Sequence, residues 1–530
     1  MNSQKKNADS VVANSKLQFL TVRLSILSLS LIFIVALFPF DIQTSRPISG
    51  AAIPDIFAGD RLFHWKDIGE IILSLVLFFI LGFSASGFFK IRRQFCDLNT
   101  LIFSCIFCIF IAVSEESIQL FIPSRFTSMT DIIFGVMGGI LGALCFHFWR
   151  FEVGNWLHRS FGRFWRWISV PKLAIALAAY TGLFLILSLL LKQSINFHDW
   201  DENFPLIIGN EIDAPRPWNG TIAALCIADS GLSESEISQL FATPESCETT
   251  AETAIASYHF RGRGPYRDRA GHLPDLVWMG TVPNHFKHQN GVVINSERWL
   301  QTREPATFAI QNIRETAAFT IGILIASADS YQVGPARIVS ISGSPYDRNL
   351  TVAQLRSDLL LRLRTPLTGK NGENPELIVP NLFRDSRFHH VIIAWDRFNL
   401  RFYIDRVESE FRLELTPGVI FFIGSASAAG RRIDVTAFDT AVYQFTYRFL
   451  IFVPSGMGWA AIAVKLRPVN RWEGLAIAAA AVGSTILLEI IFAAWNGQNG
   501  SVKNMVVNLA VLGLTLGLAR SQIAAALREP

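Results

Sequence analysis

The sequence predicts a multi-domain membrane protein, in which an eight-helix α-helical transmembrane bundle carries an all-β domain outside the membrane. Only 17% of the 530 residues are charged, against about 25% in soluble domains, and the mean hydropathy is +0.34. The apolar residues concentrate at both ends of the chain, whereas residues 195–445 alternate apolar and polar side chains, as strands do. The net charge of +4 is too small to indicate a nucleic-acid binder, and six cysteines do not make a disulfide scaffold.

Eight apolar runs are each close to the roughly 20 residues that a helix needs to cross the hydrocarbon core. They lie at about residues 20–40, 68–89, 101–121, 130–149, 173–191, 447–464, 474–494 and 504–520. We interpret the first as a retained helix, because Phe38-Pro39-Phe40-Asp41 follows it instead of a small-residue cleavage site. This predicts four segments: residues 1–150 with four transmembrane helices, 151–194 with an interfacial segment and a fifth helix, 195–445 as the β domain, and 446–530 with three helices.

Lysine and arginine in the short loops predict the orientation. Sixteen of them fall on one side of the predicted bundle and five on the other, and cytoplasmic loops carry the excess. We therefore expect a multi-pass protein of a bacterial-type inner membrane, with both termini cytoplasmic and residues 195–445 extracytoplasmic. Cys226 and Cys247 would then lie in an oxidising compartment, where they either pair or remain free. The basic, aromatic stretch 150–166 is typical of an interfacial helix held by anionic lipid.

Polar residues gather at one end of the third and fourth apolar runs. Glu116 and Gln119 share a helix face, Asp131 begins the next helix, and Arg125 lies in the short loop between them. The antiparallel arrangement of the two helices should bring these four side chains together at the outer membrane boundary. The cluster is either a polar pocket that binds or converts a ligand, or an ion-pair network that holds the hairpin together.

The C-terminal helices repeat features of the N-terminal ones. Glu489 corresponds to Glu116, and each is followed 15 residues later by a polar residue, Asp131 in the first copy and Asn504 in the second. Asn508 corresponds to Gly135 in this register. The small-residue pair Gly138 and Gly142, which lets helices approach closely, recurs one position shifted at Gly513 and Gly517. We expect two related three-helix cores with the β domain inserted between them.

At these residues the chain resembles the VanZ-like membrane family, whose core combines Phe-x-Pro-x-Gly, Glu-x-x-Gln, an Arg and Asp-x-x-x-Asn. The first copy matches at Glu116, Gln119, Arg125 and Asp131, with Gly135 in place of the Asn. The second matches at Pro454, Gly456, Glu489 and Asn508, with Asn504 in place of the Asp and no Arg at the equivalent place. The resemblance implies a link to glycopeptide antibiotic resistance through a mechanism that it does not specify.

Residues of about 300–445 resemble a concanavalin A-like jelly roll of the LamG kind. The resemblance rests on Phe319-Thr320-Ile321, on 336–342, and on 387–396 followed by 400–405, which would be adjacent antiparallel strands with a turn at 396–399. Residues 200–245 resemble the closing strands and small helix of such a domain. They either complete the sheet from the N-terminal side, which we favour, or reflect a circular permutation.

The resemblance implies two stacked sheets and glycan binding, in some relatives through calcium. Exposed aromatic side chains would be the sugar platforms, and the candidates are Trp200, Trp218, Tyr258, Tyr266 and Tyr346, each of which could instead be ordinary core. The sequence has no dense Asp/Asn calcium loop, so no cofactor or metal ligand is predicted. His389 and His390 have no third ligand at readable spacing, and we expect them to be structural.

Three functions follow as hypotheses. The leading one is a non-enzymatic envelope protein whose β domain recognises a polysaccharide or glycoconjugate and whose helices supply an anchor and a polar pocket at the outer leaflet. The second is a membrane enzyme or carrier for a lipid-linked glycan, with Glu116 as acid or base and Arg125 placing a phosphate. The third is a structural protein that docks a protein partner. All three have the lipid bilayer as a partner and exclude nucleic acid.

Overall fold

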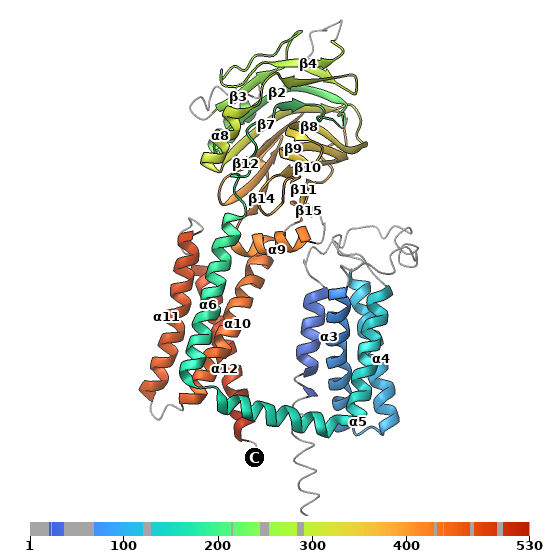
Figure 1. Cartoon of the computed structure of the whole chain (residues 1–530), viewed down its shortest axis with the longest axis vertical. Coiled ribbons are helices and arrows are strands. Elements are labelled where there is room, and N and C mark those ends of the chain that lie inside the picture. Colours follow the sequence, from blue (N-terminus) through green and yellow to red (C-terminus); the bar gives the residue numbers. More distant parts are fainter. Residues whose placement is uncertain are drawn as a thin grey trace, which may run out of the picture. The chain divides into compact units, whose positions relative to one another are not determined.

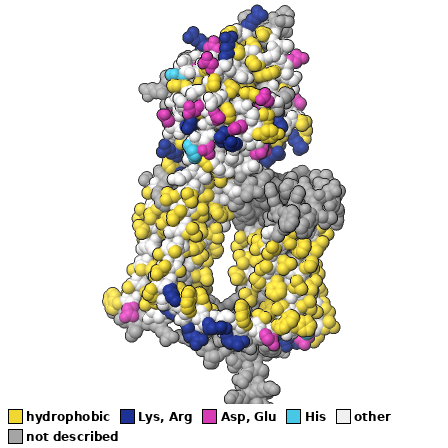
Figure 2. Space-filling view, viewed as in Figure 1, with side chains coloured by type: hydrophobic (Ala, Val, Ile, Leu, Met, Phe, Trp, Pro, Cys, Tyr) yellow, Lys and Arg dark blue, Asp and Glu magenta, His cyan; other side chains and the backbone are white. Residues whose placement is uncertain are grey.

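The computed structural model describes residues 21–22, 24–36, 68–119, 129–213, 216–243, 254–282, 291–428, 432–437, 439–466, 471–495 and 502–528. The chain forms two compact units, Met1–Ser169 and Val170–Pro530, which are described separately below (Figure 1). Hydrophobic side chains cover the outside of the long helices, whereas Lys, Arg, Asp and Glu are spread over the β domain (Figure 2). The many apolar residues of the sequence therefore lie largely on helix surfaces that are suited to contact with lipid.

The N-terminal unit is built from long apolar helices. They are α3 (Ile68–Gly87), which continues as the π-helix η3 (Phe88–Arg92), α4 (Asp97–Gln119) and α5 (Met129–Trp167). A shorter apolar helix, Leu24–Ala36, precedes them. The 39-residue helix α5 is kinked at Trp149, whose backbone is non-helical (φ −125°, ψ 18°).

The C-terminal unit holds the remaining helices and the β domain. Its long helices are α6 (Val170–Gln193), α10 (Thr440–Leu466), α11 (Arg471–Trp495) and α12 (Val502–Arg528), and its shorter helices are α7 (Glu234–Ala242), α8 (Thr307–Thr316) and α9 (Pro417–Ala428). Among the described residues of the whole chain, seven helices are long and apolar enough to cross a membrane. The predicted eighth would be the first apolar run, of which the described part is Leu24–Ala36.

Helices α3 and α5 approach each other through glycine. A Cβ atom at Gly82 would overlap the carbonyl group of Gly139, and a Cβ at Gly142 would overlap the carbonyl oxygen of Phe79. Gly138 lies equally close to the carbonyl oxygen of Leu75. The predicted small-residue face of Gly138 and Gly142 therefore makes this helix crossing.

The crossing of α10 and α12 uses corresponding positions. A Cβ at Gly456 would lie 3.1 Å from the carbonyl oxygen of Leu512 and 2.9 Å from the Cβ of Thr515. Leu512 follows Gly139 by 373 residues, the separation that also relates Glu489 to Glu116. This equal separation is what two related three-helix cores would show. The internal repeat itself stays a prediction.

The expected role of Gly513 and Gly517 is wrong. A Cβ at either position would meet no atom within 4 Å among the described residues. A shift of one residue turns a side chain by about 100° around a helix, so these glycines point away from α10. Leu512 and Thr515 make the contact instead.

The β domain consists of two sheets. The eight-stranded sheet has the order β15-β11-β10-β9-β8-β1-β6-β4, and the seven-stranded sheet has the order β14-β13-β12-β7-β2-β3 with β5 paired to β2. Neighbouring strands are antiparallel except β11 and β15. The first sheet comprises β1 (Leu206–Ile208), β4 (Leu276–Gly280), β6 (Arg298–Thr302), β8 (Gln332–Ser344), β9 (Asp347–Arg356), β10 (Asp358–Leu363), β11 (Glu376–Val379) and β15 (Arg432–Asp434). The second comprises β2 (Gly220–Ala228), β3 (Ala254–His259), β5 (Val292–Ile294), β7 (Phe319–Ser327), β12 (His389–Trp395), β13 (Asn399–Ile404) and β14 (Arg406–Glu414).

The predicted hairpin is confirmed. Strands β12 and β13 pair antiparallel with Ile392 opposite Tyr403. The turn between them is held by Asp396, whose carboxylate accepts hydrogen bonds from the backbone N–H groups of Phe398 and Asn399, both at 2.7 Å. The two strands and their turn thus lie where the resemblance implied them.

Residues 200–245 contribute to both sheets. β1 lies between β8 and β6, and β2 lies between β7 and β3. The expected small helix is α7, which Ser233 and Glu236 begin with a capping box. The segment thus completes the sheets from the N-terminal side, while the assignment of the domain as a LamG-like jelly roll stays a prediction.

Hydrogen bonds hold the helices of the C-terminal unit to the β domain and to each other where the chain passes between them. Nε2 of Gln444 on α10 donates to the Glu414 carboxylate of β14 at 2.7 Å. Lys192, at the end of α6, donates to the carbonyl oxygens of Arg397 and Leu415. Ser188 on α6 and Tyr447 on α10 share a hydrogen bond of 2.9 Å. Because α6 enters the β domain and α10 leaves it, these contacts fix the two connections side by side.

The glycine crossing predicts a selective loss of stability. Gly82→Ala places a methyl group against the Gly139 carbonyl, so it should lower the thermal unfolding midpoint of the full-length protein in detergent by several degrees. Gly513→Ala, with open space around its Cβ, should leave the midpoint unchanged or raise it, since alanine favours helix over glycine by about 1 kcal/mol. Equal midpoints for the two variants would contradict the crossing.

Candidate functional site in the membrane helices

Three polar side chains meet between the last three helices, and we call them the Glu489 centre. Arg448 on α10 is the cation, Glu489 on α11 is the carboxylate, and Asn508 on α12 is the amide. Glu489 is 5% exposed and Asn508 is completely buried. A carboxylate at such a place in an apolar helix is costly unless it is paired.

The hydrogen bonds of Glu489 come from both partners. Nη1 of Arg448 lies 3.4 Å from Oε1 and 3.3 Å from Oε2 of Glu489. Nδ2 of Asn508 donates to Oε2 at 2.8 Å. The guanidinium neutralises the carboxylate, and the amide adds a charge-assisted hydrogen bond.

Part of the hydrogen-bonding capacity of the centre is unused among the described residues. Oδ1 of Asn508 is buried and has no hydrogen-bond partner there. The Arg448 side chain is 19% exposed, and Nη1 is the one of its nitrogen atoms that bonds a described residue. A buried acceptor without a donor costs free energy, so the centre is suited to a further polar group.

The Glu489 centre lies near the end of the bundle that adjoins the β domain. Helix α10 begins shortly after β15, and Arg448 is about two turns into it. Glu489 lies about two turns before the end of α11, and Asn508 about two turns after the start of α12. The antiparallel course of the three helices brings these positions together.

Sequence reasoning missed Arg448, because the family pattern places its arginine in the loop between the second and third helices. The structure supplies the cation from the first helix of the second core instead. A signal existed: Arg448 interrupts an otherwise apolar stretch, and a charge there needs a partner. Asn504, also predicted for this site, is half-buried in the first turns of α12.

The first core also buries its acid. Glu116 and Gln119 are buried on α4, and Asp131 is half-buried in the first turn of α5. Arg125 lies outside the described residues, so the predicted four-residue cluster stays a prediction. Where the second core has Asn508, the first has Gly135, and the Phe78 ring packs 3.2 Å from the position of its missing Cβ.

A comparison with known protein families identifies the helices of the N-terminal unit. Residues 22–150 match the VanZ/LLP1 family. No curated protein and no solved structure matches the chain. The N-terminal unit therefore contains a VanZ-like domain, which covers about a quarter of the chain. The second core and the LamG-like domain are matched by no family, and both stay predictions.

Four of the five aromatic side chains that were expected to bind sugar are buried. Trp218 donates through Nε1 to Oε1 of Gln354, Trp200 donates to the carbonyl oxygen of Arg364, and Tyr258 donates to that of Pro274. Tyr266 is also buried, and its hydroxyl donates to the carbonyl oxygen of Gly262. The expectation that these four are exposed platforms is corrected, because each polar atom finds a partner in the core. Tyr346 is 77% exposed.

The paired histidines of the β domain are held by local contacts. Nδ1 of His389 lies 2.9 Å from Asp405 and Nε2 lies 3.2 Å from Asp385. The hydrogen bond to Asp405 raises the pKa of His389, whereas burial lowers the pKa of His390 to about 4. Both histidines are buried, and His389 is held by two carboxylates, as expected for residues with a structural role. Cys226 is disulfide-bonded, and its expected partner, Cys247, lies outside the described residues.

The Glu489 centre predicts strong coupling between two substitutions. Arg448→Leu and Glu489→Leu each leave one buried charge without its partner, so each should destabilise the full-length protein by about 3 kcal/mol. The double variant should lose much less than the sum, because no charge remains unpaired. Unfolding in mixed micelles measures all three.

Glu473→Gln is the matched control for this cycle, because Glu473 is an exposed acid in the first turn of the same helix. It should change stability by a few tenths of a kcal/mol at most. Additive losses from Arg448→Leu and Glu489→Leu would contradict the ion pair.

Proposed function

We propose that this VanZ-like membrane protein binds the polar headgroup of an envelope amphiphile, a lipid-linked glycan, at the Glu489 centre. The observation that carries the proposal is the buried Oδ1 of Asn508, which accepts no hydrogen bond from a described residue, beside a partly exposed arginine. Such a pair of an acceptor and a cation suits a headgroup that carries hydroxyl or amide donors next to a phosphate.

The chemistry of the two groups supports this class of ligand. A guanidinium presents five N–H donors in a planar fork that matches phosphate. Glu489 neutralises Arg448 and fixes the position of its guanidinium group. The ion pair therefore also fixes the direction of the other N–H donors of Arg448. A sugar hydroxyl or acetamido N–H on the ligand would satisfy the Asn508 oxygen.

The β domain adds the glycan side of the proposal. It follows directly on α6 and precedes α10, so it lies at the same helix ends as the Glu489 centre. We take it to recognise the envelope glycan from the extracytoplasmic side of the inner membrane. Tyr346 is exposed in the turn between β8 and β9. Of the five aromatic residues suggested by the sequence, it is the one whose ring is available to stack on a sugar.

The buried Glu116 favours a second candidate function. A carboxyl group in an apolar helix can serve as a general acid or base, and with Arg125 and Asp131 it would act on the same kind of lipid-linked glycan. The protein would then be a membrane enzyme or carrier whose VanZ-like domain converts or moves that glycan.

Binding to full-length protein in nanodiscs tests the proposal. The probe is a polyprenyl-phosphate-linked disaccharide, and the comparison ligand is the matching polyprenol. Arg448→Gln and Asn508→Ala should each weaken binding of the probe about tenfold, the equivalent of one lost charge-assisted hydrogen bond. Both should leave the weak binding of the polyprenol unchanged.

Glu473→Gln is again the control and should bind as the wild type does. Unchanged affinity in Arg448→Gln and Asn508→Ala would overturn the proposal. Glu116→Gln separates the two candidate functions: retained binding with loss of product or of transfer across the membrane supports the enzyme or carrier, and full retention of any such activity excludes Glu116 from it.

A further inference from the structure

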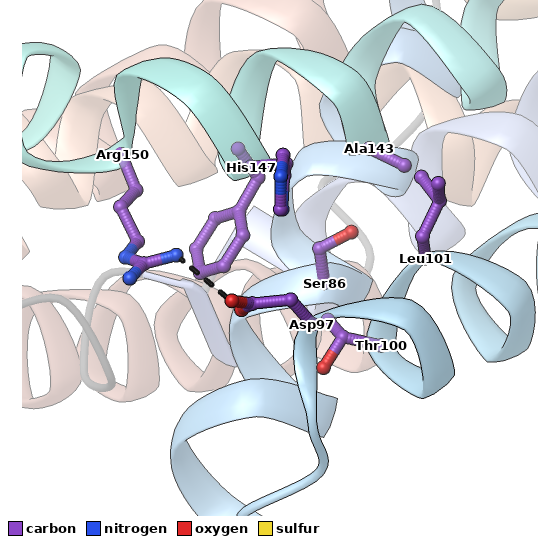
Figure 3. A pocket seen from close by; sticks show the side chains of 8 residues that line it. Ser86, Asp97, Thr100, Leu101, Ala143, His147 and Arg150 are labelled. Atoms are coloured by element: carbon purple, nitrogen blue, oxygen red, sulfur yellow. Dashed lines mark ion pairs between the residues drawn. The ribbon is translucent and has the colours of Figure 1, made fainter.

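A polar pocket lies between α3, α4 and α5 (Figure 3). Glu116 and Asp131 lie at the opposite ends of the spans of α4 and α5. The pocket opens where the transmembrane span of α3 ends at Lys90, that of α4 begins at Asp97 and that of α5 ends at Arg150. The pocket is thus level with three helix ends, where an apolar span meets water. The lining residues are Ser86, Asp97, Thr100, Leu101, Ala143, Phe146, His147 and Arg150.

Cations outnumber anions at this pocket. Nζ of Lys90 lies 2.7 Å from Oδ1 of Asp97, and Nη1 of Arg150 lies 3.9 Å from the same oxygen. Two cationic side chains therefore share one carboxylate, and His147 stands beside them (Figure 3). Lys90 and Arg150 keep about a quarter of their side-chain surface exposed, so an anion can reach both.

Neutral hydrogen-bonding groups complete the lining. The hydroxyl of Thr100 donates to the carbonyl oxygen of Cys96 and stays able to accept. Ser86 is tied to Ser104 by a hydrogen bond of 2.9 Å between α3 and α4. This bond holds the floor of the pocket, which faces the cations with hydroxyl groups and not with further acids.

Two helices lose regular geometry at the pocket. Lys90 lies in the π-helix η3, and the kink of α5 at Trp149 falls between His147 and Arg150. π-Helical turns are rare and frequent at functional sites. Both irregularities thus occur beside the two cations that pair with Asp97.

The segment of α5 after the kink has the character of an interfacial helix. Trp156, Phe164 and Trp167 are at least half exposed and recur at a spacing that places them on one helix face. The same segment carries Arg159, Arg163 and Arg166, with Glu152 as its acid. Exposed aromatic rings with arginines are typical of helices at the headgroup level.

We propose that Lys90 and Arg150, which stay partly exposed beside this pocket, bind the phosphate of an anionic phospholipid. The aromatic face after the kink keeps α5 at the depth of the headgroups, and the two cations hold a phosphate at that depth. The site is separate from the Glu489 centre and independent of the glycan that the latter is proposed to bind.

Thermal unfolding of the full-length protein in detergent tests the site. The additives are phosphatidylglycerol, phosphatidylcholine with the same acyl chains, and inorganic phosphate. Phosphatidylglycerol should raise the unfolding midpoint of the wild type, and phosphatidylcholine should not. Lys90→Gln combined with Arg150→Gln should raise the phosphatidylglycerol concentration needed for the effect about thirtyfold, as expected for the loss of two cations near a headgroup.

Asp97→Asn provides a test in the opposite direction. It removes the carboxylate that competes for both cations, so phosphatidylglycerol should stabilise this variant at lower concentration than the wild type. Lys465→Gln, a cation at the end of α10 in the other unit, is the matched control and should respond as the wild type does.

The outcomes separate the sources of the phosphate. A midpoint raised equally by inorganic phosphate supports the anion site and assigns it to a soluble phosphate. An undiminished phosphatidylglycerol effect in the Lys90/Arg150 double variant, or an unchanged response in Asp97→Asn, would overturn the proposal, because the effect would then belong to the basic surface of α5.

Discussion

A carboxylate inside an apolar helix needs a partner, and this constraint organises the C-terminal helices. Glu489 is buried on α11, so its charge is compensated from both neighbours, by Arg448 of α10 and by Asn508 of α12. The cost of desolvating the two charges is met only if the geometry is maintained. The three helices are therefore linked by one polar contact near the end that carries the β domain, and the proposed headgroup site depends on the same contact.

The two helical cores share a packing mode and differ in their polar chemistry. In both, the first and third helices cross at a glycine, Gly82 in one and Gly456 in the other, against Gly139 and Leu512 respectively. At the position equivalent to Asn508, however, the VanZ-like domain has Gly135, and Phe78 occupies the space. If the cores are related, they have diverged at the residue that would complete the acid's hydrogen bonds, so one ligand would not suit both.

The sequence predicted those features that depend on local patterns. The hairpin of β12 and β13 and the helix α7 were expected from short local segments that resemble a known fold, and the structure contains both. The apolar runs located the long helices, because span length and hydropathy are properties of contiguous residues.

Features that depend on contacts between distant segments were missed. Arg448 lies 41 residues from Glu489, and no spacing rule within one helix pairs them. Trp200 and Trp218 are buried, and their partners come much later in the chain: Arg364 directly after β10 and Gln354 on β9. Gly513 and Gly517 have the right spacing for a helix contact, but the direction in which α12 faces α10 is set by packing.

The central claim is that Glu489 is an ionised carboxylate paired with Arg448 inside the apolar bundle. Infrared difference spectroscopy of the full-length protein in lipid, comparing the wild type with Glu489→Gln at neutral pH, measures this directly. The account predicts that a carboxylate stretching band of the wild type is lost in Glu489→Gln. It also predicts that the same band shifts in frequency in Arg448→Lys. Loss of a protonated carboxyl band instead would show that Glu489 is neutral and would contradict the account.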